Sequence, residues 1–277
     1  MLLMLKSLVI GLLLSSSLQA GVTNKAVEDF LNKSFSNNRN IKSINIQVVS
    51  SMDVQTIKGW RAFIVEMNAV LKKGNRKVKQ KMIWFSNGQV ITQDLIDIKT
   101  GQTLKDLVSP VFKDEYYNKD NLIYGNADAK HKIVIFSDPL CPFCKSYVPN
   151  AIKYMKKYPK KFAVYYYHFP LASLHPASVE LVKAAHVAQK QGLRDVVLYL
   201  YNVKLDNPRE RDVYKILQAF NKTFNTNVKP SDIKSKAVLT HYKNDLDLAD
   251  TLMVQGTPTV FFDGKIDKSK NKYMKVK

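Results

Sequence analysis

Two cysteines, Cys141 and Cys144, are the only ones in the 277-residue sequence, and Pro142 and Phe143 separate them. Residues 133–136 form an unbroken apolar run that is typical of a strand buried on both faces. A helix is expected to begin at Cys141, because proline is tolerated in a first helical turn. The unpaired backbone N–H groups and the dipole of that turn would favour a thiolate at Cys141. Since Cys144 is one turn further along, the spacing predicts a redox-active dithiol that can close a small disulfide ring.

A structural disulfide and a metal site are the alternatives for the same pair of cysteines. A disulfide that closes so short a loop restrains little chain and would contribute little stability. A zinc or copper site needs further ligands, and the histidines show no ligand spacing. We therefore expect no metal and no cofactor, and we expect surface or capping roles for the five histidines: His131, His168, His175, His186 and His241.

The elements that must position the dithiol follow a strand, helix, strand order. The helix after the first strand contains Pro149, which should kink it, and a second apolar strand is predicted at residues 162–169. A helical crossover between two strands implies that they are parallel. Helical periodicity then extends over about residues 172–252, and a strand and hairpin follow with Asp263-Gly264 at the turn. The pattern predicts an α/β unit with an all-helical insertion.

Two groups of polar side chains in these elements are expected to be structural. Asp138 follows the first strand directly and is interpreted as a turn former and not as a catalytic acid. Tyr165, Tyr166 and Tyr167 lie within the second strand, where successive side chains point to opposite faces. They are expected to alternate between core and surface.

The first hundred residues predict a separate α+β domain. A helix is expected over residues 24–35, and antiparallel strands follow it, with a hairpin signal at Asn87-Gly88. This part has no cysteine and no histidine, so we expect it to serve dimerisation, substrate contact or spacing. Trp60 and Trp84 are expected in its core or in a dimer interface. The predicted boundaries are residues 21–102 for this domain, 103–125 for a linker and 126–277 for the catalytic domain.

The first twenty residues and the net charge indicate where the protein acts and what it binds. Residues 1–20 combine one early lysine, Lys6, with a short apolar stretch and small polar residues, which is typical of a secretory signal peptide. Export would place the protein in an oxidising compartment. The net charge is +20, and the lysines are spread through both halves. We interpret them as a solvated basic surface and predict no nucleic-acid partner.

The Cys-Pro-Phe-Cys motif together with Gly256-Thr257-Pro258-Thr259 resembles the active site of the thioredoxin superfamily. The resemblance implies that Pro258 is cis and packs against the dithiol, and that Thr257 presents its backbone to a substrate strand. Thioredoxins often bury an acid where this sequence has Ile135, so no group is assigned to proton transfer at Cys144. The sequence after Ile266 is too short and polar for the usual closing helix, so one face of the sheet is expected to be covered differently or by a single turn.

Within that superfamily the sequence is similar to the bacterial periplasmic DsbC/DsbG type. The predicted leader, the N-terminal domain and the threonine before Pro258 support this resemblance. It implies a cystatin-like N-terminal fold that forms a homodimer. By contrast, residues 168–171 and His175-Pro176 look more like the monomeric DsbA branch.

The resemblance implies a periplasmic disulfide isomerase or reductase that corrects misoxidised exported proteins. Cys141 and Cys144 would be catalytic and would form the redox-active disulfide, supported by Pro142, Phe143, Thr257 and Pro258. A DsbD-like membrane partner would keep the pair reduced, and a DsbB-like partner would keep it oxidised. The alternatives are a DsbA-like oxidase and a holdase chaperone for unfolded exported proteins.

Overall fold

A computed structural model describes residues 22–207 and 209–276. The leader predicted at residues 1–20 lies outside the described residues. The chain divides between Val108 and Ser109 into two compact units, each with its own apolar core. No helix in the described part is long and apolar enough to cross a membrane.

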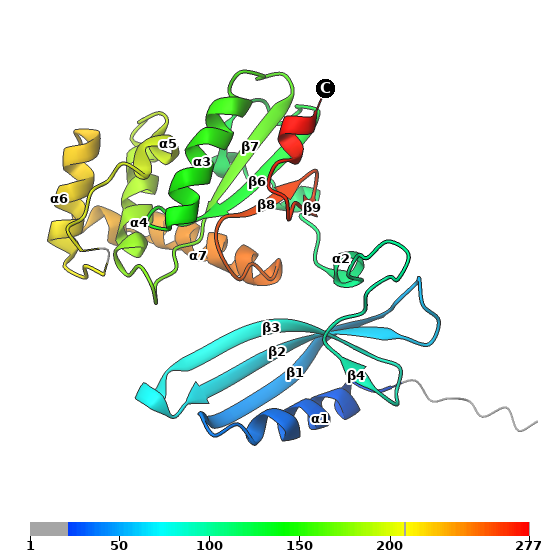
Figure 1. Cartoon of the computed structure of the whole chain (residues 1–277). Coiled ribbons are helices and arrows are strands. Elements are labelled where there is room, and N and C mark those ends of the chain that lie inside the picture. The colour runs from blue at the N-terminus through cyan, green and yellow to red at the C-terminus, as the bar shows by residue number, and fades with distance from the viewer. Residues whose placement is uncertain (1–21, 208, 277) are drawn as a thin grey trace, which may run out of the picture. The chain divides into compact units, whose positions relative to one another are not determined.

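The first unit consists of one long helix and a four-stranded antiparallel sheet with the order β1-β2-β3-β4 (Figure 1). A short helix, α2 (Lys105–Val108), ends the unit. Ile96 and Thr103 form an isolated antiparallel bridge outside the sheet. The helix and the strands of the sheet are α1 (Asn24–Ser36), β1 (Ile41–Asp53), β2 (Arg61–Leu71), β3 (Lys77–Ser86) and β4 (Ile91–Thr92).

The core of the first unit lies between α1 and one face of this sheet. Val27 and Leu31 of α1 are buried against Phe63 and Val65 of β2. Trp84 of β3 packs edge-on against Phe35 at a ring-centroid distance of 6.3 Å. The prediction of a helix and an antiparallel sheet in this part of the chain is therefore confirmed.

The second unit contains a five-stranded sheet with the order β5-β7-β6-β8-β9. β6 and β7 are parallel, as predicted for the strands on either side of a helical crossover, and the other neighbours are antiparallel. The helices α4 to α7 lie between β7 and β8 in the sequence. The elements are β5 (Leu122–Tyr124), β6 (His131–Ser137), α3 (Pro142–Met155), β7 (Phe162–His168), α4 (Ala177–Lys190), α5 (Val196–Leu200), α6 (Val213–Phe224), α7 (Lys236–Thr251), β8 (Thr259–Phe262) and β9 (Lys265–Ile266).

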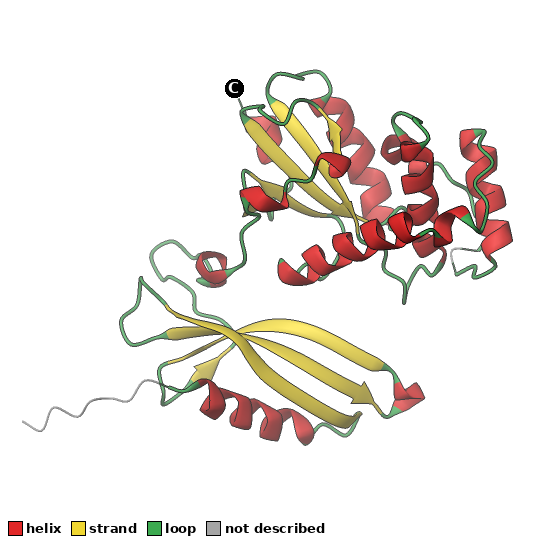
Figure 2. Cartoon of the chain, turned by 180° about the vertical axis from the view of Figure 1, so that it is seen from behind, coloured by secondary structure: helices red, strands yellow, loops and turns green. Residues whose placement is uncertain are grey.

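Both faces of the five-stranded sheet are covered, which corrects the prediction for the three tyrosines (Figure 2). Tyr166 packs with the residues of α3 on one face, whereas Tyr165 and Tyr167 pack with the residues of α7 on the other. All three are buried. They do alternate, but between two cores and not between core and surface, because helices cover each side of the sheet.

Residues 109–125, predicted as the end of a linker, belong to the second unit. Phe112 is buried in the core, and its N–H donates to the carbonyl oxygen of Gly264 at 2.7 Å. β5 pairs with the edge of β7. Between β5 and β6, Gly125 has a φ of +83°, and a Cβ there would lie 1.9 Å from the carbonyl oxygen of Phe162. Only glycine fits this close approach of two backbones.

The end of the chain forms a single 3₁₀ turn, η5 (Lys272–Lys275), in place of a closing helix. Tyr273 from this turn is buried in the core that contains α3. Its ring lies edge-on against Tyr154 at a centroid distance of 5.4 Å. Of the two expectations for this end of the chain, the structure has the single turn.

Candidate active site

Cys141 is the N-cap residue of α3, with Pro142 at the first helical position as predicted. Its carbonyl oxygen accepts the first helical hydrogen bond from Lys145 N–H at 3.0 Å. The first backbone N–H groups of a helix have no intrahelical partner and carry its positive dipole end. The Cys141 side chain therefore lies at the end of α3 that carries the unpaired N–H groups. Cys141 is 5% exposed.

Cys144 lies one turn further along α3 and is fully buried in the core beneath the sheet. Both cysteines are free thiols in this structure. Burial raises the pKa of Cys144 to about 11, while hydrogen bonds from Ser137, Thr257 and the Asp138 backbone act in the opposite direction. Cys144 therefore stays protonated at neutral pH unless the surrounding hydrogen-bond donors stabilise its thiolate more strongly during a reaction.

Thr257 and Pro258 lie next to the dithiol, and their peptide bond is cis. The Cys141 thiol donates to the carbonyl oxygen of Thr257 across 3.6 Å, although 116 positions separate the two residues in the chain. Pro258 is buried and directly precedes β8. The structure thus brings together the four residues predicted for the centre of the site: Cys141, Cys144, Thr257 and Pro258.

The other two predicted site residues, Pro142 and Phe143, face solvent. Phe143 is 76% exposed, which is unusual for a large aromatic side chain. It stands between the two cysteines in sequence, on the first turn of α3. Phe143 therefore presents an apolar ring to solvent at the start of α3.

Asp138 has a larger role than the turn former expected from the sequence. It is fully buried, and its carboxylate accepts hydrogen bonds from Leu140 N–H at 2.7 Å, Leu171 N–H at 2.7 Å and the Ser178 hydroxyl at 2.6 Å. His175 Nδ1 lies 3.0 Å from the same carboxylate. Asp138 joins the segment before Cys141 to the start of α4. The only sequence signal for this role is that a charged residue directly follows a buried strand.

The histidines differ from the surface or capping residues that were predicted. His168 and His186 are buried, and His186 stacks on His241 with ring centroids 3.8 Å apart. Burial lowers the pKa of His168 and His186, and it lowers that of His241 to about 4. His131 and His175 are partly buried and each contacts an aspartate. The packing of α4 and α7 creates this environment, which the spacing in the sequence does not reveal.

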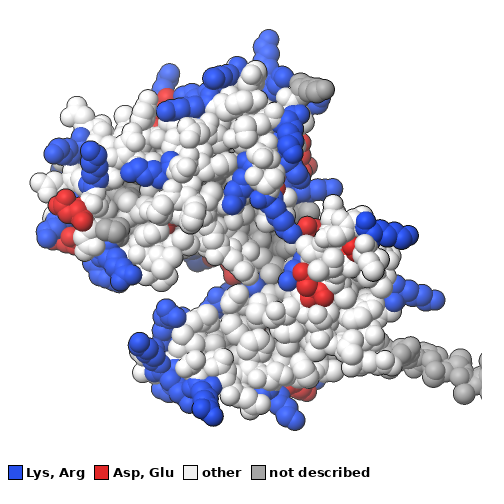
Figure 3. All heavy atoms as spheres, in the orientation of Figure 1, with Lys and Arg blue, Asp and Glu red and all other residues white. Residues whose placement is uncertain are grey.

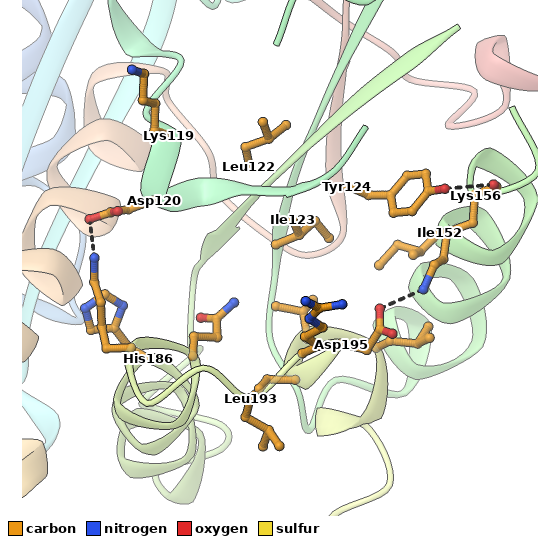
Figure 4. A pocket seen from close by; sticks show the side chains of 16 residues that line it. Lys119, Asp120, Leu122, Ile123, Tyr124, Ile152, Lys156, His186, Leu193 and Asp195 are labelled. Atoms are coloured by element: carbon orange, nitrogen blue, oxygen red, sulfur yellow. Dashed lines mark hydrogen bonds and ion pairs between the residues drawn. The ribbon is translucent and has the colours of Figure 1, made fainter. Parts of the chain in front are cut away.

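A separate cavity of about 520 Å³ lies in the second unit, lined by residues of β5, α3, α4 and α5 (Figure 4). Its charged side chains include two ion pairs: Asp195 with Lys156 at 2.7 Å and Asp120 with Lys190 at 2.9 Å. Neither cysteine lines this cavity. In residues 22–207 and 209–276, no group of three or more His, Cys, Asp or Glu side chains could hold a metal ion.

The basic side chains are distributed over the visible face of each unit and do not gather in one patch (Figure 3). Many acidic side chains pair with lysines on the surface, as in Lys25 with Asp29 and Lys243 with Asp247. The net charge of +20 is therefore carried by many separate, solvated lysines and arginines.

A family model described as thioredoxin matches residues 117–277. Two curated relatives are Na⁺/H⁺ antiporter NhaA 1 proteins, one from Mycolicibacterium gilvum at 29% identity over 147 residues and one from Mycobacterium sp. (strain KMS) at 26% identity over 147 residues. These alignments cover 52% and 53% of this chain but only 23% and 24% of the relatives. The chain thus spans about a quarter of the length of the curated relatives it matches.

Solved structures similar to this chain include three bacterial proteins. BdbD from Bacillus subtilis is 19% identical with a TM-score of 0.47, and the match covers 60% of this chain and 91% of that one. ScsC from Proteus mirabilis in a compact conformation is 28% identical with a TM-score of 0.44, covering 56% and 74%. DsbA2 from Pseudomonas aeruginosa is 21% identical with a TM-score of 0.39, covering 55% and 91%.

Proposed function

Because the chain belongs to the thioredoxin family, whose model spans residues 117–277, we propose that it is a thiol–disulfide oxidoreductase. The observation that carries the proposal is the geometry of the dithiol. Cys141 caps a helix with its sulfur 3.6 Å from the carbonyl oxygen of Thr257, and Cys144 lies fully buried behind it. One sulfur can therefore meet a substrate while the other is kept from reacting with solvent.

The reaction would proceed by thiol–disulfide exchange. The Cys141 thiolate attacks one sulfur of a substrate disulfide, the substrate S–S bond breaks, and a mixed disulfide forms while the other substrate cysteine leaves as a thiolate. In reduction, Cys144 then attacks the Cys141 sulfur, which closes the Cys141–Cys144 disulfide and releases the second substrate cysteine. In isomerisation, a free substrate thiolate attacks instead, so that no net electrons are transferred.

We propose that the protein acts mainly as an isomerase or reductase for misoxidised exported proteins, as in the DsbC/DsbG type. The leader pattern at residues 1–20 supports export to the periplasm. The separate N-terminal unit supports a cystatin-like domain that forms a homodimer, which would place two dithiols around one substrate. A DsbD-like membrane protein would return the oxidised pair to the dithiol.

A DsbA-like oxidase is the second candidate. The observation in its favour is the contact of His175 with Asp138, in the segment that directly precedes Cys141. His175-Pro176 belongs to the stretch that looks more like the DsbA branch, and this contact holds that stretch against the turn before Cys141. In that case a DsbB-like membrane partner would reoxidise the pair.

The test compares wild type with Cys141→Ala in two assays, reduction of insulin and refolding of scrambled ribonuclease. We expect the variant to lose both activities, because Cys144, the only other cysteine, is fully buried. Ser146→Ala, on the exposed side of the same helix, is the matched control and should keep both. Unchanged refolding by Cys141→Ala would contradict the enzyme and support a holdase chaperone.

The direction of the reaction is measured separately. Equilibration with glutathione gives the redox potential of the dithiol, and two ribonuclease assays give the rates. An isomerase or reductase is expected to work with a reduced pair and to rearrange scrambled ribonuclease catalytically. An oxidase is expected to oxidise reduced ribonuclease quickly and to rearrange it poorly. The ratio of these two rates distinguishes the two candidates.

A further inference from the structure

A chain of three buried hydroxyl groups runs through the core of the second unit. The Tyr166 hydroxyl lies 2.8 Å from the Tyr201 hydroxyl, and the Tyr201 hydroxyl lies 2.8 Å from the Ser137 hydroxyl. The three residues come from β7, the end of α5 and the last position of β6. Tyr166 and Tyr201 are each 2% exposed, and Ser137 is fully buried. Three polar groups on different elements are thus joined in a place otherwise lined by apolar side chains.

This chain ends at the sulfur of Cys144. The Ser137 hydroxyl and the Asp138 backbone N–H act on Cys144 as hydrogen-bond donors and favour its thiolate. The Thr257 hydroxyl favours the thiolate too, but its oxygen is buried and has no hydrogen-bond partner in the described part of the chain. A buried polar group without a strong partner is costly. A negative sulfur at Cys144 would give it one.

Position 135, where an acid would serve Cys144 in related proteins, is a buried isoleucine in this chain. We propose that the hydroxyl chain of Ser137, Tyr201 and Tyr166 takes over this task and stabilises the Cys144 thiolate that resolves the mixed disulfide. The inference rests on the proposed function. Ser137 contacts the reacting sulfur, whereas Tyr201 and Tyr166 are positioning residues that act through it.

The three hydroxyl groups can act as hydrogen-bond donors but not as bases. Burial raises the pKa of both Tyr166 and Tyr201, so both phenols keep their protons at neutral pH. Either partner can donate in each of the two hydrogen bonds. When Tyr166 donates to Tyr201 and Tyr201 donates to Ser137, the Ser137 proton is free to point at the sulfur. Aligned hydroxyl groups polarise one another, so the last donor is stronger than an isolated serine.

The step that this chain assists conserves atoms and electrons. The Cys144 thiolate attacks the Cys141 sulfur of the mixed disulfide, the bond between Cys141 and the substrate sulfur breaks, and the Cys141–Cys144 disulfide forms. The proton that Cys144 gave up ends on the departing substrate thiolate. Cys141 and Cys144 are oxidised by two electrons, and the substrate is reduced by two.

Reaction with an aromatic disulfide, Ellman's reagent, separates the two attacks in the full-length protein. The first coloured thiolate is released when Cys141 attacks the reagent, and the second when Cys144 attacks the mixed disulfide. Stopped-flow absorbance therefore gives both rates in one experiment. Loss of a donor to a charged sulfur should raise the pKa of Cys144 by about one unit. Because the less acidic thiolate is also a better nucleophile, the second phase should become about fourfold slower.

We expect this slowing in Ser137→Ala and, to a lesser degree, in Tyr201→Phe, with the first phase within about twofold of wild type. The pH profile of the second phase should shift to higher pH. Tyr165→Phe is the matched control, because it removes a phenol from the same strand on the opposite face of the sheet, and it should change neither phase.

Two results would overturn the inference. One is a second phase with an unchanged rate and pH profile in both Ser137→Ala and Tyr201→Phe. The other is an equal slowing of both phases, which would indicate a general disturbance of the site. Since each change removes only an oxygen atom, unfolding is not expected, and Tyr166→Phe tests the far end of the chain independently. Failure of the proposed function would instead appear as two normal phases without insulin reduction.

Discussion

Asp138 positions the segment that leads into Cys141. Four groups donate to or contact its buried carboxylate, and two of them, Leu171 N–H and His175 Nδ1, come from the segment between β7 and α4. A buried carboxylate is stable only when its hydrogen-bonding capacity is used. This residue therefore links the active-site turn to the helices that follow β7.

Replacement of Asp138 by alanine should destabilise the second unit by about 3 kcal/mol, because it leaves several buried donors unpaired. Urea unfolding followed by circular dichroism measures this loss, since α3 to α7 all lie in the second unit. Both tryptophans lie in the first unit, so the tryptophan fluorescence transition should not move. Asp247→Ala, which removes an exposed ion pair with Lys243, should cost less than about 1 kcal/mol. Equal losses in the two variants would contradict this role.

His241 should make the second unit sensitive to mild acid. Burial lowers its pKa in the folded protein to about 4, from an ordinary value of 6.5. As the pH falls below 6.5, the unfolded chain binds this proton before the folded chain does. The stability linked to the neutral ring is therefore complete above pH 6.5 and is lost as the pH falls towards 4. Between pH 7.5 and pH 5 this loss amounts to about 2 kcal/mol.

The variant His241→Phe isolates this contribution, because a phenyl ring can still stack on His186. Asp245, whose pKa burial raises to about 7, acts with the opposite sign over the same range, so wild type and variant are compared at each pH. On going from pH 7.5 to pH 5, the change in urea midpoint should be more negative for wild type than for His241→Phe. The same change in both would refute the assignment to His241.

At the scale of elements, the terminal turn η5 completes the core that a closing helix would otherwise cover. Tyr273 is buried against α3, and the Tyr147 hydroxyl of α3 donates to the carbonyl oxygen of Lys270 at 2.7 Å. Tyr273→Ala should cost about 3 kcal/mol by leaving a cavity beside α3. Met274→Ala, one position further along and half exposed, should cost less than about 1 kcal/mol. Circular dichroism during urea unfolding tests both, and a similar cost for the two would show that the turn does not cover the core.

Helices, strands and turns whose position depends on adjacent residues were predictable from the sequence. The apolar run at residues 133–136 lies within β6, and Pro142 occupies the first position of α3. Asn87-Gly88 separates β3 from β4, where Gly88 has a φ of 92°. In each case the preference lies in the backbone or in the period of a few adjacent side chains.

Side-chain environments that form between segments distant in the chain were not predictable from the sequence. Ser137 and Tyr201 are 64 positions apart and meet only because α5 packs against the sheet. His186 and His241 stack because α4 and α7 lie together. One sequence contains no signal for such pairings. It therefore predicts the dithiol but not the hydroxyl chain behind it.

At the scale of the whole molecule, the two units divide the proposed work. The second unit holds the dithiol, Thr257 and Pro258, and its apolar core is separate from that of the first unit. The first unit has a 13-residue strand, β1, at the edge of its sheet, and no other described strand pairs with its outer side. An open edge of this length is a ready site for pairing with another chain. The first unit is therefore the part to which we assign dimer formation.

Deletion of the first unit should separate assembly from chemistry. We expect the full-length protein without its leader to sediment as a dimer, and a variant limited to residues 109–277 to sediment as a monomer. The monomer should keep insulin reduction, because its dithiol and its core are complete. It should lose most of its ability to rearrange scrambled ribonuclease, because a substrate would no longer be held between two dithiols. A monomeric full-length protein, or a monomeric variant that rearranges ribonuclease as fast as the full-length protein, would remove the isomerase assignment and favour the oxidase.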